Sequence, residues 1–458
     1  MAFEDSVFMR EVREVIDKGT RNAFWRWEAT LHADGKNMGT HYVDNVDILR
    51  DYLSNAFDVI TVEVGVLPAT FEKFFVPNKD ILEITLKRTP LSETGNSEVE
   101  AESAQSYRYR AMLYDAQSGV VEGTDPTLQR IDVGDNANIR RVRLQLTDPV
   151  VEQLRLKTVG GVMRNTTALN AVRTMLGAAS KTVKNAEDVV AVHGVDLAAG
   201  GIDVVRDHVI VPHMTKLVNM PQYVHENQGG LYNGGFGYYL QNGIWFLYAP
   251  FDIKRYPKAK RTLTVLNVPA ERFPSPERSY RTTEQQVIVL ATGEVKHTDV
   301  SEELQVNLGN GVRFADANRL FTSFVEVTGN KATASRGKNT AEFVYEDRRT
   351  KVNNAQASPV GITANYPVER GRIAARAGSY IQLVWEASDA SLLYPGMPTK
   401  IMYLENGRAQ ELYGILVGAH TFFSQVNMGI KERRFMSKTA MLLFVDKKIS
   451  FDDPDYVK

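Results

Sequence analysis

Apolar and polar residues alternate along several segments of the first third of the chain. In residues 24–32, Trp25, Trp27 and Leu31 fall on one face, and charged or polar residues fall on the other. This period of two is the spacing of a strand with one buried face. The segments that alternate are residues 24–32, 59–66, 82–86, 107–114 and 139–147. Residues 20–147 are therefore predicted to form one antiparallel sheet or barrel.

Other segments of the same region carry apolar residues at helical spacing. They recur three or four residues apart along residues 5–17, which predicts a short amphipathic opening helix. Val46, Leu49 and Leu53 predict a second, brief helix within residues 43–52. Both helices would lie next to the strands of the first β block.

A region that mixes helices and strands follows. Asp148 is a favourable N-cap and Pro149 a favourable first helical residue, so a helix is predicted to begin here, and Thr167 can cap a second one. The Asn-Gly pair at 242–243 supplies both positive-φ positions of a type I′ turn, which predicts an aromatic-rich hairpin. Residues 148–252 are therefore expected to form a small mixed domain.

Strand patterns return from residue 262 onward. They cover residues 262–268, 285–290, 304–308, 380–386, 400–404, 411–417 and 439–445. Asn406 and Gly407 predict the tight turn of a long antiparallel hairpin. Residues 329–378 lack periodicity and are rich in Gly, Ala, Asn, Ser and Arg, so a long extended loop or arm is expected there.

The predicted fold class is mainly β with an α+β insert, made of two tube-like antiparallel β-barrel domains and a small mixed α/β domain. The predicted domains are residues 1–147, with the N-terminal helix and first β-barrel; 148–252, the inserted mixed α/β domain; 253–445, the second β-barrel block with the extended arm 329–378; and 446–458, an acidic C-terminal tail.

Composition narrows the range of partners. At 458 residues the chain is long enough for several domains. Its 54 Lys and Arg nearly balance 55 Asp and Glu, which gives no support for a nucleic-acid or membrane footprint and favours protein partners. The lack of cysteine excludes disulfides and thiolate chemistry. The first residues lack signal-peptide features and no run is long enough for a spanning helix, so the chain is expected to be made and kept soluble unless a separate machine moves it.

The histidines do not form a recognisable metal site. His208 and His213 are five residues apart in a strand-like run, so they fall on opposite faces and cannot chelate one ion as a local pair. His32 and His41 flank a predicted Asp-Gly turn with two aspartates nearby, a grouping that could bind a divalent ion. Their spacing matches no established ligand set, and surface hairpin residues are the favoured interpretation.

The remaining candidate chemistry is weak. Residues 229–237 are dense in glycine but lack the Lys-Ser/Thr of a phosphate loop, so they are interpreted as a flexible lead-in to the hairpin. The surrounding aromatics could stack on bases or sugars, but alternation through a hairpin favours packing. Arginines at 108, 110, 141 and 143 could bind an anionic partner, although a charged outer sheet face is the ordinary explanation.

A pair of catalytic carboxylates is not excluded by the sequence, because a sequence gives no distances between side chains. No catalytic, cofactor-binding or metal residue is assigned, and the chain is not predicted to be an enzyme.

Two segments carry a resemblance to a known family. They are Gly235–Pro250, with the Asn-Gly hairpin, and Tyr394–Ile401, with its Pro-Gly-Met-Pro motif, which Leu412–Leu416 follows. Together with the order of a β block, a mixed insert and a second β block, they resemble the baseplate hub proteins of contractile-tailed phages and related injection systems. The resemblance covers most of the chain.

The resemblance implies two tube-like barrels in each subunit and a homotrimer whose barrels form a pseudo-sixfold ring. Such a ring joins the tail tube to the central spike, in the virion, after synthesis in the host cytoplasm. The implied partners are the tail tube, central spike, tape-measure and baseplate wedge proteins; the genome passes through the central channel without sequence-specific contact, and no membrane or cofactor is implied. Residues 329–378 and the acidic tail are expected to make contacts between subunits or with partners.

Three alternatives stay open. A tail-tube or tail-completion protein would be built round a single barrel and is commonly shorter. A carbohydrate-binding or carbohydrate-cleaving β protein would use the dense Trp and Tyr residues. A solute-binding module would use the aromatic hairpin as a pocket wall.

Overall fold

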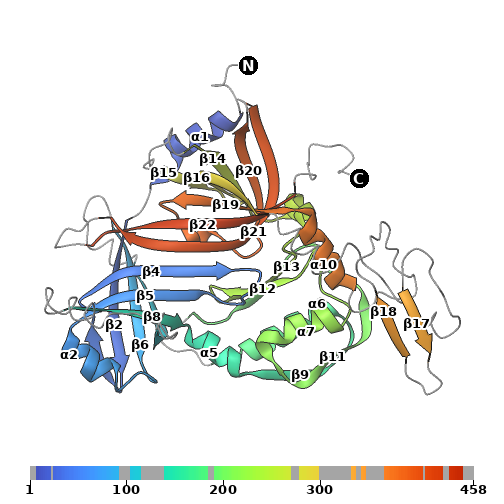
Figure 1. Cartoon of the computed structure of the whole chain (residues 1–458), viewed down its shortest axis with the longest axis horizontal. Coiled ribbons are helices and arrows are strands. Elements are labelled where there is room, and N and C mark those ends of the chain that lie inside the picture. The colour runs from blue at the N-terminus through green and yellow to red at the C-terminus, as the bar shows by residue number, and fades with distance from the viewer. Residues whose placement is uncertain are drawn as a thin grey trace.

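The computed structural model is mainly β and contains one large mixed sheet (Figure 1). The residues that it describes are 7–21, 24–91, 104–114, 139–183, 190–269, 278–298, 332–336, 342–346, 366–405, 408–426 and 433–446. Strand pairing within the large sheet branches, because four of its described strands each have three partners. The branching produces two closed circuits, each a series of hydrogen-bonded strand pairs that returns to its first strand.

The first circuit is antiparallel throughout. In order of pairing, its strands are β21 (Arg408–Gln425), β4 (Tyr42–Asp51), β5 (Val59–Val66), β8 (Arg140–Thr147), β7 (Gln105–Leu113), β6 (Glu83–Leu91), β2 (Phe24–Ala33) and β22 (Phe435–Val445), which pairs with β21. β2 meets β22 through the single pair Trp25 and Phe435. Strand β3 (Lys36–Gly39) extends β2 as a hairpin through Asp34 and Gly35, both at positive φ.

The second circuit shares two strands with the first. In order of pairing, its strands are β16 (Gln286–Thr298), β14 (Thr262–Val268), β20 (Pro398–Glu405), β21, β22 and β19 (Ser379–Glu386), which pairs with β16. Strand β15 (Arg278–Thr282) pairs with β16, and the short β1 (Thr20–Arg21) pairs with β15. In Figure 1 the shared strands β21 and β22 run between the two groups of strands.

The prediction that both β blocks are antiparallel throughout is wrong for the second. Strand β14 pairs parallel with both β16 and β20. Its sequence is almost continuously apolar because both of its faces are covered. Leu263 and Val265 face the core inside the circuit, whereas Leu266 and Val268 pack against the opening helix. A strand that is buried on both faces lacks the alternation of apolar and polar residues seen in antiparallel strands with one solvated face. Burial of both faces is typical of parallel strands.

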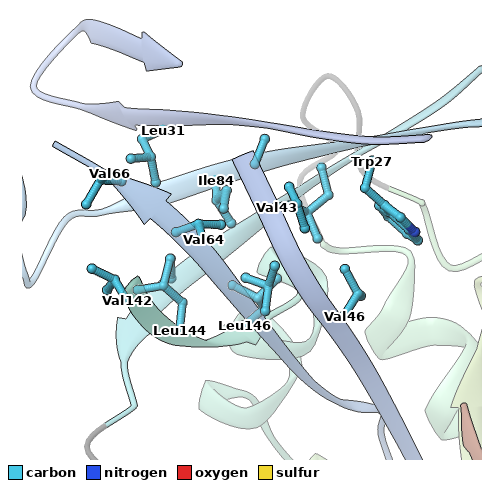
Figure 2. Packing of buried hydrophobic residues seen from close by; sticks show 14 of the residues in the cluster. Trp27, Leu31, Val43, Val46, Val64, Val66, Ile84, Val142, Leu144 and Leu146 are labelled. Atoms are coloured by element: carbon cyan, nitrogen blue, oxygen red, sulfur yellow. The ribbon is translucent and has the colours of Figure 1, made fainter. Parts of the chain in front are cut away.

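The circuits enclose separate hydrophobic cores. Figure 2 shows the first, where Leu31, Val64 and Leu144 from different strands lie among one another. The second contains Trp385, Leu443 and Ile401. Each core takes side chains from the shared strands, Phe423 for the first and Leu416 for the second. The two cores are thus filled from opposite ends of one strand.

The mixed region packs as a third core. Its elements are α5 (Pro149–Leu156), β9 (Thr158–Thr167), α6 (Ala168–Ser180), β10 (Gly194–Leu197), β11 (Val205–Lys216), η3 (Leu217–Asn219), α7 (Met220–Asn227), β12 (Gly237–Gln241) and β13 (Ile244–Tyr248). Asp148 caps α5 by accepting a hydrogen bond from the Val150 amide, and Thr167 caps α6 through the Asn170 amide. Asn242 and Gly243 take positive φ between β12 and β13, which confirms the predicted turn.

The opening helix α1 (Val7–Lys18) forms where it was predicted. Its buried face, with Phe8, Val12 and Val15, covers the outer side of β14 and β16. The helix therefore lies on the second circuit, although the prediction grouped it with the first β block. The short helices η4 (Ile253–Lys258) and η5 (Ala390–Leu392) also flank the second circuit, and α2 (Pro68–Thr70) with η2 (Phe71–Phe75) flank the first.

The brief helix predicted within residues 43–52 is wrong, since these residues form β4. A register shift lies between Val43 and Asn45 in the pairing with β5. The extra residue leaves Val43 and Val46, three apart, both facing the first core. The helical spacing of Val46 and Leu49 does not mark a common buried face, since Val46 is buried in the first core whereas Leu49 is 39% exposed.

The predicted arm at 329–378 contains regular structure in the parts that are described. Strands β17 (Ala332–Arg336) and β18 (Glu342–Glu346) form a hairpin, and α10 (Tyr366–Ala377) is a helix. The helix follows from its Ala, Arg and Glu content and from Pro367 near its start. The remaining residues of the predicted arm, the predicted strand 304–308, the turn residues Asn406 and Gly407, and residues 447–458 lie outside the described ranges.

We expect Leu144→Ala to lower the free energy of unfolding by about 2–5 kcal/mol, because the side chain is fully buried in the first core and its loss leaves a cavity. Urea unfolding followed by tryptophan fluorescence measures this, with Trp25 and Trp27 as reporters in β2. The matched control is Leu156→Ala, where the leucine is 81% exposed. Equal losses in the two variants would contradict the assignment of the core.

Candidate functional site at the junction of the circuits

The most distinctive polar arrangement in the described structure lies where both circuits meet the β12–β13 hairpin. Tyr52, directly after β4, packs edge-on against Tyr239 of β12 with ring centroids 4.8 Å apart. The Tyr52 hydroxyl donates to Oε1 of Gln241 (3.1 Å), and the Tyr248 hydroxyl donates to the Tyr52 carbonyl (2.5 Å). The hairpin is therefore fastened to the first circuit by buried hydrogen bonds.

The same residues reach the second circuit. The Gln241 amide nitrogen donates to the carbonyl of Leu393, which follows η5 (2.7 Å). Gln241 is buried, so leaving either end of its amide without a partner would cost stability. One side chain thus joins the chain after β4 to the chain before β20.

An ion pair strengthens the junction. Nε of Arg50 in β4 lies 3.2 Å from Oδ2 of Asp58, and Oδ1 of Asp58 accepts the Tyr239 hydroxyl (2.8 Å). Nη1 of Arg50 donates to the carbonyl of Ala390 in η5 (3.2 Å). Arg50, which belongs to the first circuit, therefore contacts η5, which precedes β20 of the second circuit. Its counter-ion Asp58 accepts a hydrogen bond from the hairpin.

The electrostatics of the junction favour fixed protonation states. Burial acts to lower the pKa of Arg50, but the charge and hydrogen bond of Asp58, together with Tyr52 and Tyr239, outweigh it and raise that pKa. Burial raises the pKa of the Tyr52 and Tyr239 phenols well above the usual value. The phenols stay protonated at neutral pH, so they act as hydrogen-bond donors and not as nucleophiles. The arrangement can hold parts together; it does not present a poised acid or base.

The glycine-dense segment 229–237 is not the flexible lead-in that its composition predicted. The Leu231 amide donates to Nδ1 of His225 at the end of α7 (3.1 Å), and the Ile202 amide donates to the Leu231 carbonyl (2.8 Å). Gly230 takes positive φ, and a Cβ there would collide with Pro367 of α10. The glycines serve tight turns and close packing.

Among the histidines singled out in the sequence, His32 takes a structural position, whereas His208 and His213 are exposed. His32 is held by Asn37 (2.8 Å) and Thr85 (2.9 Å). Across the described ranges, no group of three His, Asp or Glu residues could hold a metal ion. His208 lies opposite Arg164 in the β9–β11 ladder, and a register shift follows between Val211 and Thr215.

The arginine rows lie on the outer face of the first circuit and have carboxylate partners. Arg108 pairs with Glu83 on the neighbouring strand, and Arg141 lies 3.6 Å from Asp44. The pairs are exposed, so each contributes little to stability.

The aromatics of the hairpin are mostly buried, in agreement with the packing role predicted for them. Trp245 and Tyr248 are among the most buried large side chains. No helix in the part of the chain that is described is long and apolar enough to cross a membrane.

Sequence reasoning missed the junction itself. Arg50 and Tyr52 fell in the segment taken for a helix, and Asp58 stood in an unremarked loop. Gln241 gave the one usable signal, since a polar residue preceding the Asn-Gly turn on a strand of aromatics is unusual in a buried hairpin.

We expect Asp58→Asn to lower the free energy of unfolding by about 2–3 kcal/mol, because it leaves the buried Arg50 charge without its counter-ion. This is below the cost for a fully buried pair, since the Asp58 side chain keeps 24% exposure. Urea unfolding provides the measurement. Glu83→Gln, which breaks the exposed pair with Arg108, is the control and should cost less than about 1 kcal/mol; a control loss as large as that of Asp58→Asn would show that burial does not matter here.

His225 predicts a loss of stability in acid. Burial lowers the pKa of His225 from 6.5 to about 4. As pH falls from 6.5 to 4, the unfolded chain therefore binds a proton at His225 that the folded chain does not bind. The free energy of unfolding falls by up to about 3 kcal/mol across that window. Unfolding free energies at pH 7 and pH 4.5 measure the loss. His225→Asn keeps an acceptor for the Leu231 amide without titrating, so its difference between the two pH values should be smaller; an unchanged difference would assign the loss to other groups.

No protein-family model matches the chain, and no curated protein matches it significantly. Solved structures do match. A tail protein from Neisseria meningitidis is 10% identical, with 93% of this chain and 98% of that chain covered and a TM-score of 0.40. A 43 kDa tail protein of prophage MuSo2 from Shewanella oneidensis is 10% identical, with coverage of 92% and 99% and a TM-score of 0.43. A type VI secretion component from E. coli, described as similar to T4 tail proteins gp27 and gp5, is 9% identical, with coverage of 90% and 76% and a TM-score of 0.37. The chain is thus similar, over most of its length, to phage tail proteins and a secretion-system component of known structure.

Proposed function

We propose that this chain is a structural protein of a phage tail, the baseplate hub, of which three copies form a pseudo-sixfold ring between tail tube and central spike. The observation that carries the proposal is the pair of closed strand circuits in one chain, joined by β21 and β22. The sequence resemblance to baseplate hubs implies two tube-like barrels in each subunit. In this proposal each circuit is one of those barrels, so that three copies supply six.

The shared strands support such a role physically. Closing a sheet removes the unpaired edges on which strands aggregate, and a ring subunit must leave only its intended interfaces free. Because β21 and β22 run through both circuits, the circuits cannot rotate against each other without breaking strand pairs. A rigid pair of tubes at a fixed spacing is what a threefold ring needs to present six positions.

The domain division follows from the same proposal. The first barrel is residues 24–147 completed by β21 and β22, the mixed domain is residues 148–252, and the second barrel takes the strands after residue 253. Residues 329–378 and 446–458 are proposed as contact segments with other subunits or with tube, spike, tape-measure and wedge proteins. The location would be the baseplate of the virion.

The junction supports a structural role over catalysis. Its ionisable groups, Arg50, Asp58 and the buried tyrosines, are all engaged with one another, with Gln241 or with backbone carbonyls. A catalytic site would expose such groups to a substrate.

The alternatives fare less well against particular residues. A tail-tube or tail-completion protein would need one barrel, whereas two circuits are present. A carbohydrate-binding protein would present flat aromatic faces to sugars, but Trp245, Tyr239 and Tyr248 are buried at the junction and in the third core. Burial likewise excludes Trp245, Tyr239 and Tyr248 from the wall of a solute pocket, and of these strands' aromatics the half-buried Phe246 lines a groove.

We expect the purified protein to assemble into trimers, three times 51.3 kDa or about 154 kDa, measured by native mass spectrometry. Averaged particle images of the trimer should show a ring with six density lobes of two alternating kinds, because the circuits differ in strand number. A monomer at all concentrations, or a ring with another number of copies, would refute the hub assignment.

A further inference from the structure

A groove of about 460 Å³ lies beside the junction, between the mixed domain and the second circuit. Its walls come from β10, the β12–β13 hairpin, the chain from η4 to β14, and the chain from η5 to β20. The side chains that matter here are Arg255, Lys258, Lys260, Arg261, Phe246 and Tyr394.

The groove has an unbalanced charge. Arg255, Lys258, Lys260 and Arg261 line it, whereas Asp196 is the only carboxylate among its lining residues. Within the described ranges, none of the four cations forms an ion pair. Elsewhere on the surface, arginines such as Arg108 and Arg141 do have carboxylate partners. A cluster of uncompensated cations in a concave site favours an anionic ligand.

Arg255 is the innermost of the four. Its side chain is 7% exposed, and one guanidinium nitrogen donates to the carbonyl of Gly396. Its Nε is buried without a partner, and so is Nε of Arg261. Burial lowers the pKa of Arg255, which means that the charged form is held at a cost. A carboxylate placed in the groove would offset that cost.

One wall of the groove is aromatic. Phe246 and Tyr394 stack with their centroids 5.9 Å apart and their planes at 20°, and both remain half-buried. The groove thus offers cations beside a flat apolar surface. A segment that carries both carboxylates and aromatic rings is the chemical complement of such a surface.

The chain contains such a segment close by. Residues 451–456 read Phe-Asp-Asp-Pro-Asp-Tyr, with three carboxylates between two aromatic rings. The described chain leads towards the groove, because Phe444 at the end of β22 packs against Phe251, two residues before η4, with centroids 4.9 Å apart. From Val445, six residues can span about 20 Å. The six residues of η4 extend about 12 Å, so the groove is within reach.

We propose that this groove binds the acidic segment 451–456 of the same chain. The carboxylates would lie against the four cations, and an aromatic ring of the segment would pack on the Phe246 and Tyr394 wall. Binding would attach the chain beyond β22 to the mixed domain. It would thereby add a contact between this domain and the second circuit to that made by Gln241. The proposal does not depend on the hub role, since it concerns one chain, and for residues 451–456 it replaces the contact with other subunits or partners considered above.

Paired cysteines test the proposal, and the absence of native cysteine makes any introduced pair unambiguous. In the full chain carrying Lys260→Cys and Asp453→Cys, mild oxidation should form a disulfide within one chain, seen as a loss of two hydrogens in the intact mass. The control pair is Val162→Cys with Asp453→Cys, because Val162 is 55% exposed on β9 in the mixed domain. This pair should stay reduced.

Charge supplies the second measurement. Adding Asp452→Asn and Asp455→Asn to the Lys260 and Asp453 pair should slow disulfide formation about tenfold, which corresponds to about 1.4 kcal/mol for the two lost ion pairs together. Urea unfolding of the reduced protein, which should give the same midpoint with and without the asparagines, is the folding control. A disulfide between two chains would give the groove to a second copy. That outcome would overturn the proposal. So would a pair of cysteines that stays reduced, or a rate of disulfide formation that the asparagines leave unchanged.

Discussion

The pairing of β21 with β22 is the constraint on which the rest of the structure depends. β21 pairs with β20 through residues 408–415 and with β4 through residues 418–423, so it changes neighbour in mid-strand. A register shift at Leu416 and Gly418 marks the change. One strand pair therefore lies in both circuits, and each circuit takes its core from a different end of it. Neither circuit would close if the pair were lost.

The mixed domain is attached to this strand pair by polar groups more than by apolar area. Arg50, Tyr52 and Gln241 each bond to a part of the chain distant in sequence, and all are buried. Hydrogen bonds of this kind add modest net stability but penalise any displaced arrangement, because a shift would leave buried donors and acceptors unsatisfied. The junction thus fixes orientation, whereas the three hydrophobic cores supply most of the driving force.

The sequence predicted what depends on local pattern and missed what depends on contacts at long range. Alternation identified β2, β5 and β8, and the caps Asp148 and Thr167 identified α5 and α6. In β4 the exposed Leu49 follows the buried Val46 at helical spacing, so that strand was missed. The parallel pairing of β14 left no trace beyond a run of apolar residues. The junction could not be predicted, because Gln241 and Leu393 meet across 152 positions and no local feature of either segment implies the other.

In the proposed ring, the unequal make-up of the circuits limits how a sixfold partner could be held. The first circuit is antiparallel throughout and the second contains two parallel pairs, so six barrels would be of two alternating kinds. The outer faces carry cross-strand ion pairs in both, such as Arg141 with Asp44 and Lys400 with Glu411. Because these charges are already paired within the chain, they offer little directional attraction to a partner. The two kinds of barrel can share a shape and a backbone arrangement, but they do not share a charge pattern. A tube of identical subunits would then be held by shape complementarity and backbone contacts.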